Sequence, residues 1–338
     1  MTERSRGVYF LANDPYIEWV IALLESVRAW NPTLPICCIP FDDRSTRLAD
    51  LATRYGFSVL DDPTLARLDG IGRRLRPSSG GDGLPPGVFR KLATFWGPFD
   101  EFVFLDADVI VTCDLGPILD TLDATGSDLT YMHGAPFSAV YAPGSQLRER
   151  GGSTAWTEGI TTGVWAARRG LMSEADVDAF ATAIEPYRDE ILYSDQTFIS
   201  HYFESHLIPV AAFEQAHRVG GLSGGYLAGG IVWNKPFGLN RDGGRPVLHI
   251  PYLDTDVLIT HWAGVKLNPQ MPYRRIWRLY RWPGSGLDQR LRRWTDAAAS
   301  GPMAARRWAG RLRRRRRGWD KGGYDAHGPG SVASSVRG

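Results

Sequence analysis

The chain has 338 residues, of which 43% are hydrophobic and 12% aromatic, and this composition excludes an intrinsically disordered protein. Its formal charge of +2 is unevenly distributed, because residues 271–338 contain 17 basic and 4 acidic side chains, whereas the first 270 residues contain 22 and 33. Three cysteines, two of them adjacent, fit neither a disulfide framework nor a zinc site, and no run is apolar enough for a signal peptide or a transmembrane helix.

The N-terminal part of the chain alternates between strand and helix patterns. Apolar runs predict buried strands at 8–12, 35–39 and 57–60, and helical spacing predicts helices at 15–30 and 44–55. This βαβαβ order predicts an α/β fold with a doubly wound, mostly parallel central sheet and flanking helices.

The later elements are separated by Gly-rich and Pro-rich segments. We expect loops at 77–87, 143–153 and 220–230, helices at 88–96 and 173–184, and extended segments at 102–105, 128–132, 160–166, 247–250 and 257–260. No linker is evident before residue 270. The sequence therefore predicts one catalytic domain over 1–270, a basic Arg/Trp-rich helical tail over 271–317 and a disordered end over 318–338.

Two aspartates interrupt an apolar run at residues 102–111, which reads FVFLDADVIV. Ligands in open α/β sheets bind at the carboxyl ends of the strands, where Asp106 and Asp108 are expected to lie. Alternation places both side chains on one face of an extended segment, and two converging carboxylates suit a hard divalent cation. A strand-end turn with two solvated acids is the simpler alternative.

With this pair the sequence resembles the nucleotide-sugar glycosyltransferases of the GT-A fold, in particular family 8, which contains glycogenin and bacterial galactosyltransferases. Five segments carry the resemblance across residues 8–269: NDPY at 13–16, KLATFWGPFDEFVFLDAD at 91–108, ITTGVW at 160–165, SDQ at 194–196 and HWAGVK at 261–266. The resemblance implies a GT-A fold and transfer of a hexose from a nucleotide diphosphate sugar, UDP above all, to an unknown acceptor. It also implies dependence on manganese, or magnesium, and retention of the anomeric configuration.

The resemblance assigns roles to individual residues. Asp106, Asp108 and His261 would bind the metal, and Lys266 would bind the diphosphate as a point charge. Asp195 and Gln196 would line the donor sugar; whether Asp195 acts as a nucleophile or the acceptor attacks directly stays open. The residues expected to contact the nucleotide sugar are Leu11, Ala12, Asn13, Tyr16, Lys91, Asp106, Ala107, Thr161 and Gly264.

Several of these positions also have a simpler interpretation. Asn13 is a plausible helix N-cap, and Lys91 could be an ordinary surface lysine, with Arg90 serving in its place. Thr161 stands where the family usually has an asparagine, and Lys266 follows the histidine at a spacing one residue shorter than is common. A sugar-phosphate nucleotidyltransferase is the rival enzyme, although NDP at 13–15 is not the Gly-rich basic loop that it would need. A non-catalytic carbohydrate-binding or nucleic-acid-binding protein is the other alternative.

The basic tail suggests placement of the enzyme in the cell. Ile276, Leu279 and Tyr280 recur at helical spacing between arginines, a pattern typical of a helix lying on an anionic membrane. A solvated, disordered end is the alternative, and nucleic-acid binding is not expected because no recognised module accompanies the charges. We therefore expect a cytoplasmic protein that associates peripherally with the inner face of a membrane.

Overall fold

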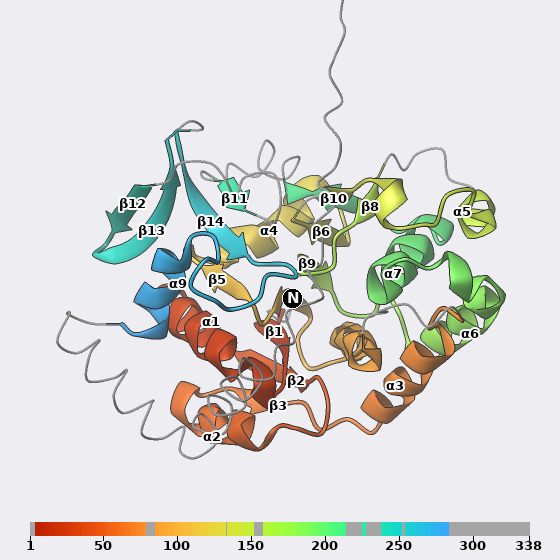
Figure 1. The fold of residues 1–338 in the computed structure, drawn as a ribbon, viewed down its shortest axis with the longest axis horizontal. Coiled ribbons are helices and arrows are strands. Elements are labelled where there is room, and N and C mark those ends of the chain that lie inside the picture. Colours follow the sequence, from red (N-terminus) through yellow and green to blue (C-terminus); the bar gives the residue numbers. More distant parts are fainter. Residues whose placement is uncertain are drawn as a thin grey trace, which may run out of the picture. The chain divides into compact units, whose positions relative to one another are not determined.

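The computed structural model describes residues 4–78, 85–132, 134–151, 158–213, 225–227, 238–251 and 254–283. These belong to one compact unit that ends at Pro283 (Figure 1). The Arg-rich run at 311–317 and the end predicted to be disordered, 318–338, lie outside the described residues.

A seven-stranded sheet in the order β10-β6-β9-β4-β1-β2-β3 forms the centre of the fold. All neighbouring pairs are parallel except those of β9, which runs antiparallel to β4 and β6. The mostly parallel sheet predicted from the sequence is therefore confirmed. Its strands are β1 (Arg6–Ala12), β2 (Ile36–Pro40), β3 (Ser58–Val59), β4 (Glu101–Asp106), β6 (Leu129–Tyr131), β9 (Val164–Arg168) and β10 (Val210–Ala212).

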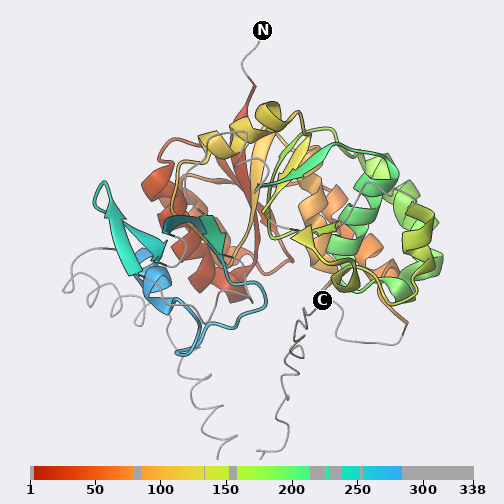
Figure 2. The same ribbon diagram turned by 90° about the horizontal axis from the view of Figure 1, so that it is seen from above.

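Helices cover both faces of this sheet (Figure 2), because alternate side chains of each strand enter different cores. From β1, Val8 and Phe10 pack with α1, α2 and α4, whereas Tyr9 and Leu11 pack with α3, η2, α6 and α7. These helices are α1 (Ile17–Trp30), α2 (Thr46–Tyr55), α4 (Gly116–Thr125), α3 (Thr64–Arg74), the 3₁₀ helix η2 (Pro86–Phe95), α6 (Glu174–Ile184) and α7 (Ser194–Ser205).

A second sheet, which the sequence did not predict as a separate unit, lies beside the first. It has the order β11-β14-β13-β12, and β5 pairs antiparallel with β14. Its strands are β5 (Val109–Val111), β11 (Gly225–Leu227), β12 (Gly238–Asp242), β13 (Arg245–Ile250) and β14 (Thr255–His261). The remaining short elements are η1 (Asp14–Tyr16), β7 (Gly134–Ala135), η3 (Phe137–Ala139), α5 (Gln146–Gly151), β8 (Gly159–Ile160) and η4 (Glu185–Glu190).

In several places the structure differs from the elements expected from the sequence. The helix α3 was not predicted, because Gly70 and Gly72 weaken its helical propensity. Gly72 is nevertheless needed, since a Cβ there would lie 2.7 Å from the carbonyl oxygen of Pro86. The segment 143–153 contains the short helix α5 instead of only a loop, and the helix at 88–96 is the 3₁₀ helix η2.

The helix α9 (Arg274–Arg281), which the sequence placed in the tail, belongs to the compact unit and packs on α1. Ile276 and Tyr280, expected to face lipid, are 0% and 3% exposed and lie in a core cluster with side chains of α1. The apolar face of this helix is therefore occupied inside the protein. Within the described residues, no helix combines the length and apolarity that a bilayer crossing requires.

Candidate active site

Asp106, Asp108 and His261 meet where the two sheets join. Asp106 is the last residue of β4, and Asp108 lies in the turn between β4 and β5. His261 ends β14 and is the ladder partner of Val109, so the antiparallel pairing of β5 with β14 brings the imidazole next to the two carboxylates. The backbone therefore places all three side chains at the carboxyl end of the central sheet, as the resemblance implied.

The three side chains form a donor set suited to a divalent cation. Their ligand atoms lie within 4.8 Å of one another. Nε2 of His261 is 3.3 Å from Oδ1 of Asp108 and 3.8 Å from Oδ2 of Asp106. Two carboxylates and one imidazole are side chains that can together hold a divalent cation.

The charges at this cluster are strongly coupled. Burial raises the pKa of Asp106 to about 6, against the lowering influence of Lys91 and His261. Burial by itself would lower the pKa of His261, but the carboxylates of Asp108 and Asp106 outweigh it and raise that pKa above the ordinary value. Two carboxylates held this close in a partly buried position are unfavourable without a compensating cation.

Gly163 makes room for the histidine. It lies just before β9, and its carbonyl oxygen accepts a hydrogen bond of 2.8 Å from the backbone N–H of Asp106. A Cβ at this position would lie 2.1 Å from Cε1 of His261 and within 3 Å of both ring nitrogens. The absence of a side chain at Gly163 is therefore a condition for the observed position of the imidazole.

Replacing Gly163 with alanine is expected to displace His261 and weaken Mn²⁺ binding by about 10- to 100-fold, the range seen when a metal ligand loses its support. Isothermal titration calorimetry of the folded variant would measure the affinity. Gly70→Ala is the matched control, because a Cβ at Gly70 has its nearest neighbour at 3.9 Å. Equal Mn²⁺ affinity of G163A and the unaltered protein would contradict this role of Gly163.

Lys91 connects the candidate metal ligands to Asp195. Its Nζ lies 2.7 Å from Oδ2 of Asp195 and 3.6 Å from Oδ1 of Asp106, and it donates to the carbonyl oxygen of Thr162 at 3.1 Å. Thr162 Oγ1 donates to the same oxygen of Asp195 at 2.7 Å. The lysine is 4% exposed and Asp195 2%, so this is a buried ion pair and not a surface lysine.

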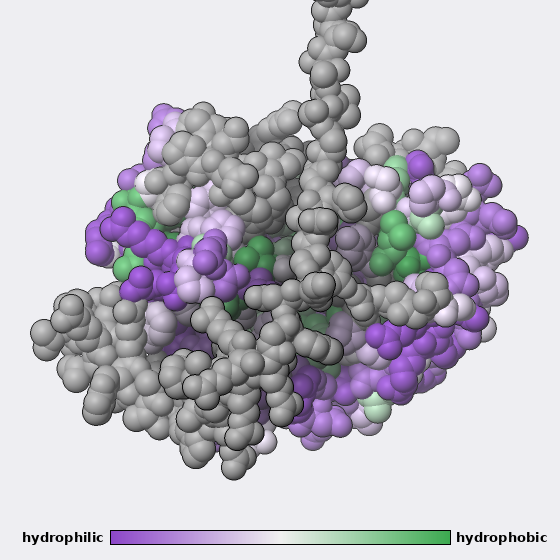
Figure 3. All heavy atoms as spheres, viewed as in Figure 1, coloured by the Kyte–Doolittle hydropathy of each residue, from purple (hydrophilic) through white to green (hydrophobic). Residues whose placement is uncertain are grey.

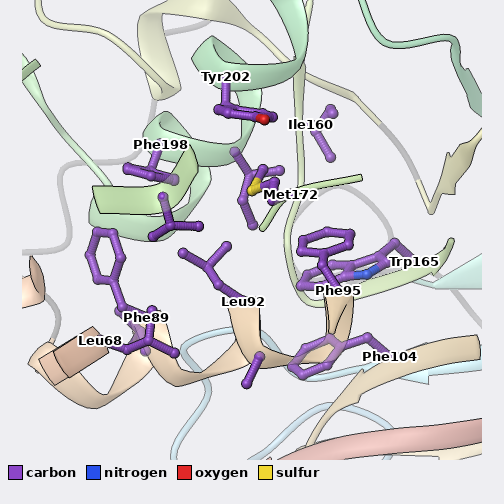
Figure 4. Close-up of a cluster of buried hydrophobic side chains, with 14 of the residues drawn as sticks. Leu68, Phe89, Leu92, Phe95, Phe104, Ile160, Trp165, Met172, Phe198 and Tyr202 are labelled. Carbon is purple, nitrogen blue, oxygen red and sulfur yellow. The ribbon is translucent and has the colours of Figure 1, made fainter. Parts of the chain in front are cut away.

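The surroundings keep Lys91 charged. Burial would lower its pKa, but Asp106 and Asp195 outweigh that effect and the pKa is raised. The rings of Phe104 and Trp165, stacked with centroids 4.2 Å apart, lie 5.2 and 5.7 Å from Nζ. Figure 4 shows both rings beside Phe95 in the core formed by η2, α7, β4 and β9. Two stacked, buried aromatic rings therefore lie next to the ammonium group of Lys91.

Arg90 does not take the place of Lys91. Its guanidinium donates to both carboxylate oxygens of Asp69, at 2.8 and 2.5 Å, and to the carbonyl oxygen of Pro40 at 2.9 Å. It thus connects η2 to α3 and β2 rather than to the carboxylates around Lys91. The two adjacent cations serve different parts of the structure.

Asn13 directly follows β1 and is buried, with 2% of its surface exposed. It occupies the N-cap position of η1, as the simpler interpretation expected, but its side chain makes no helix-capping hydrogen bond. Nδ2 donates to Oδ2 of Asp42 at 2.8 Å, whereas Oδ1 is buried and has no partner in the described part of the chain. The neighbouring Asp14 instead accepts from the backbone N–H groups of Arg47 and Leu48 at the start of α2. An unpaired buried acceptor is costly and is what a ligand donor would satisfy.

The other predicted residues differ in how much of their surface is exposed. Leu11, Ala12 and Ala107 are buried, Gln196 and Thr161 are half-buried, and Tyr16 is 51% exposed. Gly264 adopts a φ of +69° in the segment after β14, which an L side chain rarely adopts, and Lys266 two residues later is exposed. The structure thus brings Lys91, Asp106, Asp108, Asp195 and His261 into one contact group, of which the exposed Lys266 is not a member.

Sequence reasoning missed three residues of the site. Thr162 and Gly163 belong to the segment ITTGVW, but the sequence does not indicate their roles. Thr162 donates a hydrogen bond to Asp195, and Gly163 leaves space for the imidazole of His261. Asp42 follows β2, the neighbour of β1 in the sheet, so the rule that strand ends meet at one edge could have indicated it.

Among the described residues that are visible in Figure 3, hydrophilic ones predominate and hydrophobic ones form small separate areas. Six large hydrophobic side chains among the described residues are exposed: Tyr16, Val59, Leu192, Tyr193, Leu207 and Leu267. Leu192 and Tyr193 directly precede α7, the helix that carries Asp195.

No protein-family model matches the chain, and no curated protein matches it in sequence. Solved structures are similar in fold. WbbM, a bifunctional glycosyltransferase, has a TM-score of 0.52 and 14% identity, over 87% of this chain and 52% of WbbM. An active-site mutant of LgtC has a TM-score of 0.50 and 15% identity, over 81% and 94%. The apo form of the glycosyltransferase GlyE from Streptococcus pneumoniae TIGR4 has a TM-score of 0.49 and 15% identity, over 88% and 64%.

The chain therefore spans less than two thirds of the length of GlyE and of WbbM. Identities of this size show the fold and nothing finer. The α/β fold of GT-A type, expected from the sequence, is confirmed. Membership of family 8 stays a prediction.

Proposed function

We propose that the protein is a metal-dependent glycosyltransferase that moves a hexose from a nucleoside diphosphate sugar to an acceptor with retention of configuration. The observation that carries the proposal is the convergence of Asp106, Asp108 and His261 beside the buried pair of Lys91 and Asp195. A cation site next to a further carboxylate, which is paired with a buried lysine, suits a donor that has a charged diphosphate at one end and a neutral sugar at the other.

Asp106, Asp108 and His261 are the residues that would hold the metal, with Mn²⁺ favoured over Mg²⁺ by the imidazole. A divalent cation bound there supplies charge neutralisation for the departing nucleoside diphosphate. Gly163 keeps the space that the imidazole occupies. Lys266, exposed after β14, is assigned to the diphosphate as a second positive charge, and the positive φ of Gly264 shapes the backbone beside it.

We assign Asp195 and Gln196 to the donor sugar. Nζ of Lys91 and Oγ1 of Thr162 both donate to the same oxygen of Asp195, Oδ2. That pairing fixes the carboxylate and balances its charge, so it is better prepared to accept hydrogen bonds from sugar hydroxyls than to attack as a free nucleophile. Thr161, adjacent to this pair, and Lys91 complete the sugar side of the site.

The nucleoside is assigned to the end of β1. Asn13 offers a buried acceptor without a partner among the described residues, and the exposed ring of Tyr16 offers a flat surface for a base. The backbone of Leu11 and Ala12, and of Ala107 between the two aspartates, borders the same strand ends. UDP is the nucleotide that the resemblance favours.

A donor screen tests the proposal directly. In the presence of Mn²⁺, one or more UDP-hexoses should raise the apparent melting temperature of the protein, because a bound ligand stabilises the folded state by mass action. The same UDP-hexoses should also be hydrolysed slowly. Without a divalent cation both effects should be much smaller. The nucleotidyltransferase alternative predicts instead that a nucleoside triphosphate and a sugar phosphate form a nucleotide sugar and pyrophosphate. A non-catalytic binding protein would show stabilisation without release of UDP.

The cellular placement of the enzyme stays a proposal. The Arg-rich run that would attract an anionic membrane lies outside the described residues. Flotation of liposomes containing anionic lipid, with the full chain and with a chain ending at Pro283, would separate membrane docking from a solvated tail.

A further inference from the structure

Three tryptophans from distant parts of the chain form one contact group, the tryptophan cluster (Trp19, Trp262 and Trp277). Trp19 comes from α1, Trp262 follows β14, and Trp277 comes from α9. The ring of Trp19 is 5.5 Å from that of Trp262 and 5.9 Å from that of Trp277, and all three side chains are at most 4% exposed.

This cluster is directly connected to two of the candidate metal ligands. Trp262 is the residue after His261, and its backbone N–H donates to the carbonyl oxygen of Asp108 at 3.0 Å. Its indole N–H donates to the carbonyl oxygen of Pro272 at 2.7 Å, just before α9. Ile110 of β5, two residues after Asp108, is fully buried in the same core. The strand that follows Asp108 and the strand that ends at His261 therefore both contribute side chains to the core that contains the tryptophan cluster.

The helix that supplies Trp277 is firmly attached. Nε1 of Trp30 donates to the hydroxyl of Tyr280 at 2.8 Å, and that hydroxyl donates to the carbonyl oxygen of Pro246 at 2.7 Å. Arg281, which is 5% exposed, pairs with Glu18 of α1 at 2.8 Å. Figure 1 shows α9 lying beside α1 below β13 and β14. A helix fixed at several points can transmit its position to what packs against it.

We infer that Trp277 is a positioning residue for the metal site: through Trp19 and Trp262 it holds Asp108 and His261 in place for a divalent cation. The inference rests on the proposed function, since it assigns that cation to Asp106, Asp108 and His261. Removal of the Trp277 ring leaves a cavity beside Trp19, into which Trp19 and Trp262 can relax. Asp108 and His261 then lose their fixed positions and have to be ordered again when the cation binds. The affinity of the site for the cation falls because this ordering costs free energy.

The test is Mn²⁺ titration of folded variants by isothermal titration calorimetry, supported by electron paramagnetic resonance of free Mn²⁺. Trp277→Ala should bind Mn²⁺ about tenfold more weakly, the lower end of the effect of outer-sphere substitutions. Trp277→Phe should stay within about twofold of the unaltered protein, because it keeps a ring and removes an indole N–H that is buried without a partner among the described residues. Trp277→Leu serves the same comparison if the alanine variant does not fold.

The control for lost stability is Phe57→Ala. Phe57 is 7% exposed and packs edge-to-face on Phe10 in a different core cluster, so its loss should lower the free energy of unfolding without weakening Mn²⁺ binding. Unchanged Mn²⁺ affinity in a folded Trp277→Ala or Trp277→Leu protein would overturn the inference and leave the metal site standing. Absence of Mn²⁺ binding by the unaltered protein would overturn the metal site itself, and this inference with it.

Discussion

Replacement of Asp108 with asparagine is expected to reduce metal-dependent release of UDP from the donor by about a thousandfold, the order seen when one group that stabilises developing charge is removed. Asp108 is the carboxylate nearest to Nε2 of His261, at 3.3 Å. An amide oxygen is a much weaker ligand than a carboxylate, so the affinity for Mn²⁺ should fall as well. Donor hydrolysis measured over a series of Mn²⁺ concentrations would reveal both effects.

The fold should tolerate this change. Burial is the main cause of the raised pKa of Asp106, and repulsion from Asp108 adds to it. Neutralising Asp108 relieves that repulsion, so the free energy of unfolding without metal should change by less than about 1 kcal/mol. Asp120→Asn is the matched control, because the same chemical change there falls on a side chain that is 64% exposed and pairs with Arg6. Undiminished, metal-dependent turnover by D108N would remove the basis of the proposed function.

Substitution of Lys91 with methionine is the second change expected to have a large effect. It would leave Asp106 and Asp195 close together without their shared cation, and loss of one partner from a buried ion pair costs about 3–5 kcal/mol. Turnover should be lost together with this stability, since Asp195 would no longer be fixed. Urea denaturation would measure the free energy of unfolding, and donor hydrolysis would measure the turnover.

A double substitution separates the two consequences. Lys91→Met combined with Asp195→Asn removes the uncompensated charge, so it should recover much of the lost stability but none of the turnover. Arg90→Met is the control for loss of a buried cation, because Arg90 pairs with Asp69 and should cost stability while leaving turnover of the folded protein intact. Full activity of K91M would show that the lysine is only a structural ion-pair partner.

Much of the fold could be predicted from local sequence patterns. The strand of Asp106 was recognisable because an apolar run ended in two aspartates. The rule that ligands bind at the carboxyl ends of strands then predicted the location of the candidate site. The helix cap at Ser173 was also predictable, since its side chain and that of Asp176 form the reciprocal hydrogen bonds that their spacing implies.

What could not be predicted depends on contacts between distant segments. The role of Gly163 follows from the imidazole of His261 lying against it, and no local pattern records that contact. Ile276 looked like a membrane-facing residue because an apolar helical face has the same spacing whether lipid or protein covers it. The pairing of β5 with β14, which brings the candidate metal ligands together, joins strands that lie far apart in the sequence, and no local pattern indicates it.

That pairing has a consequence for the order in which the protein is made. Asp108 and His261 are separated by about 150 residues, so a nascent chain that has emerged only as far as β13 can already contain every strand of the central sheet but lacks His261, one of the three proposed metal ligands. Closing so long a loop costs conformational entropy that only the finished β14 and α9 can offset. The proposed cation site can therefore be completed only after the strands of the central sheet, including the end of β1 that is assigned to the nucleoside, have been made.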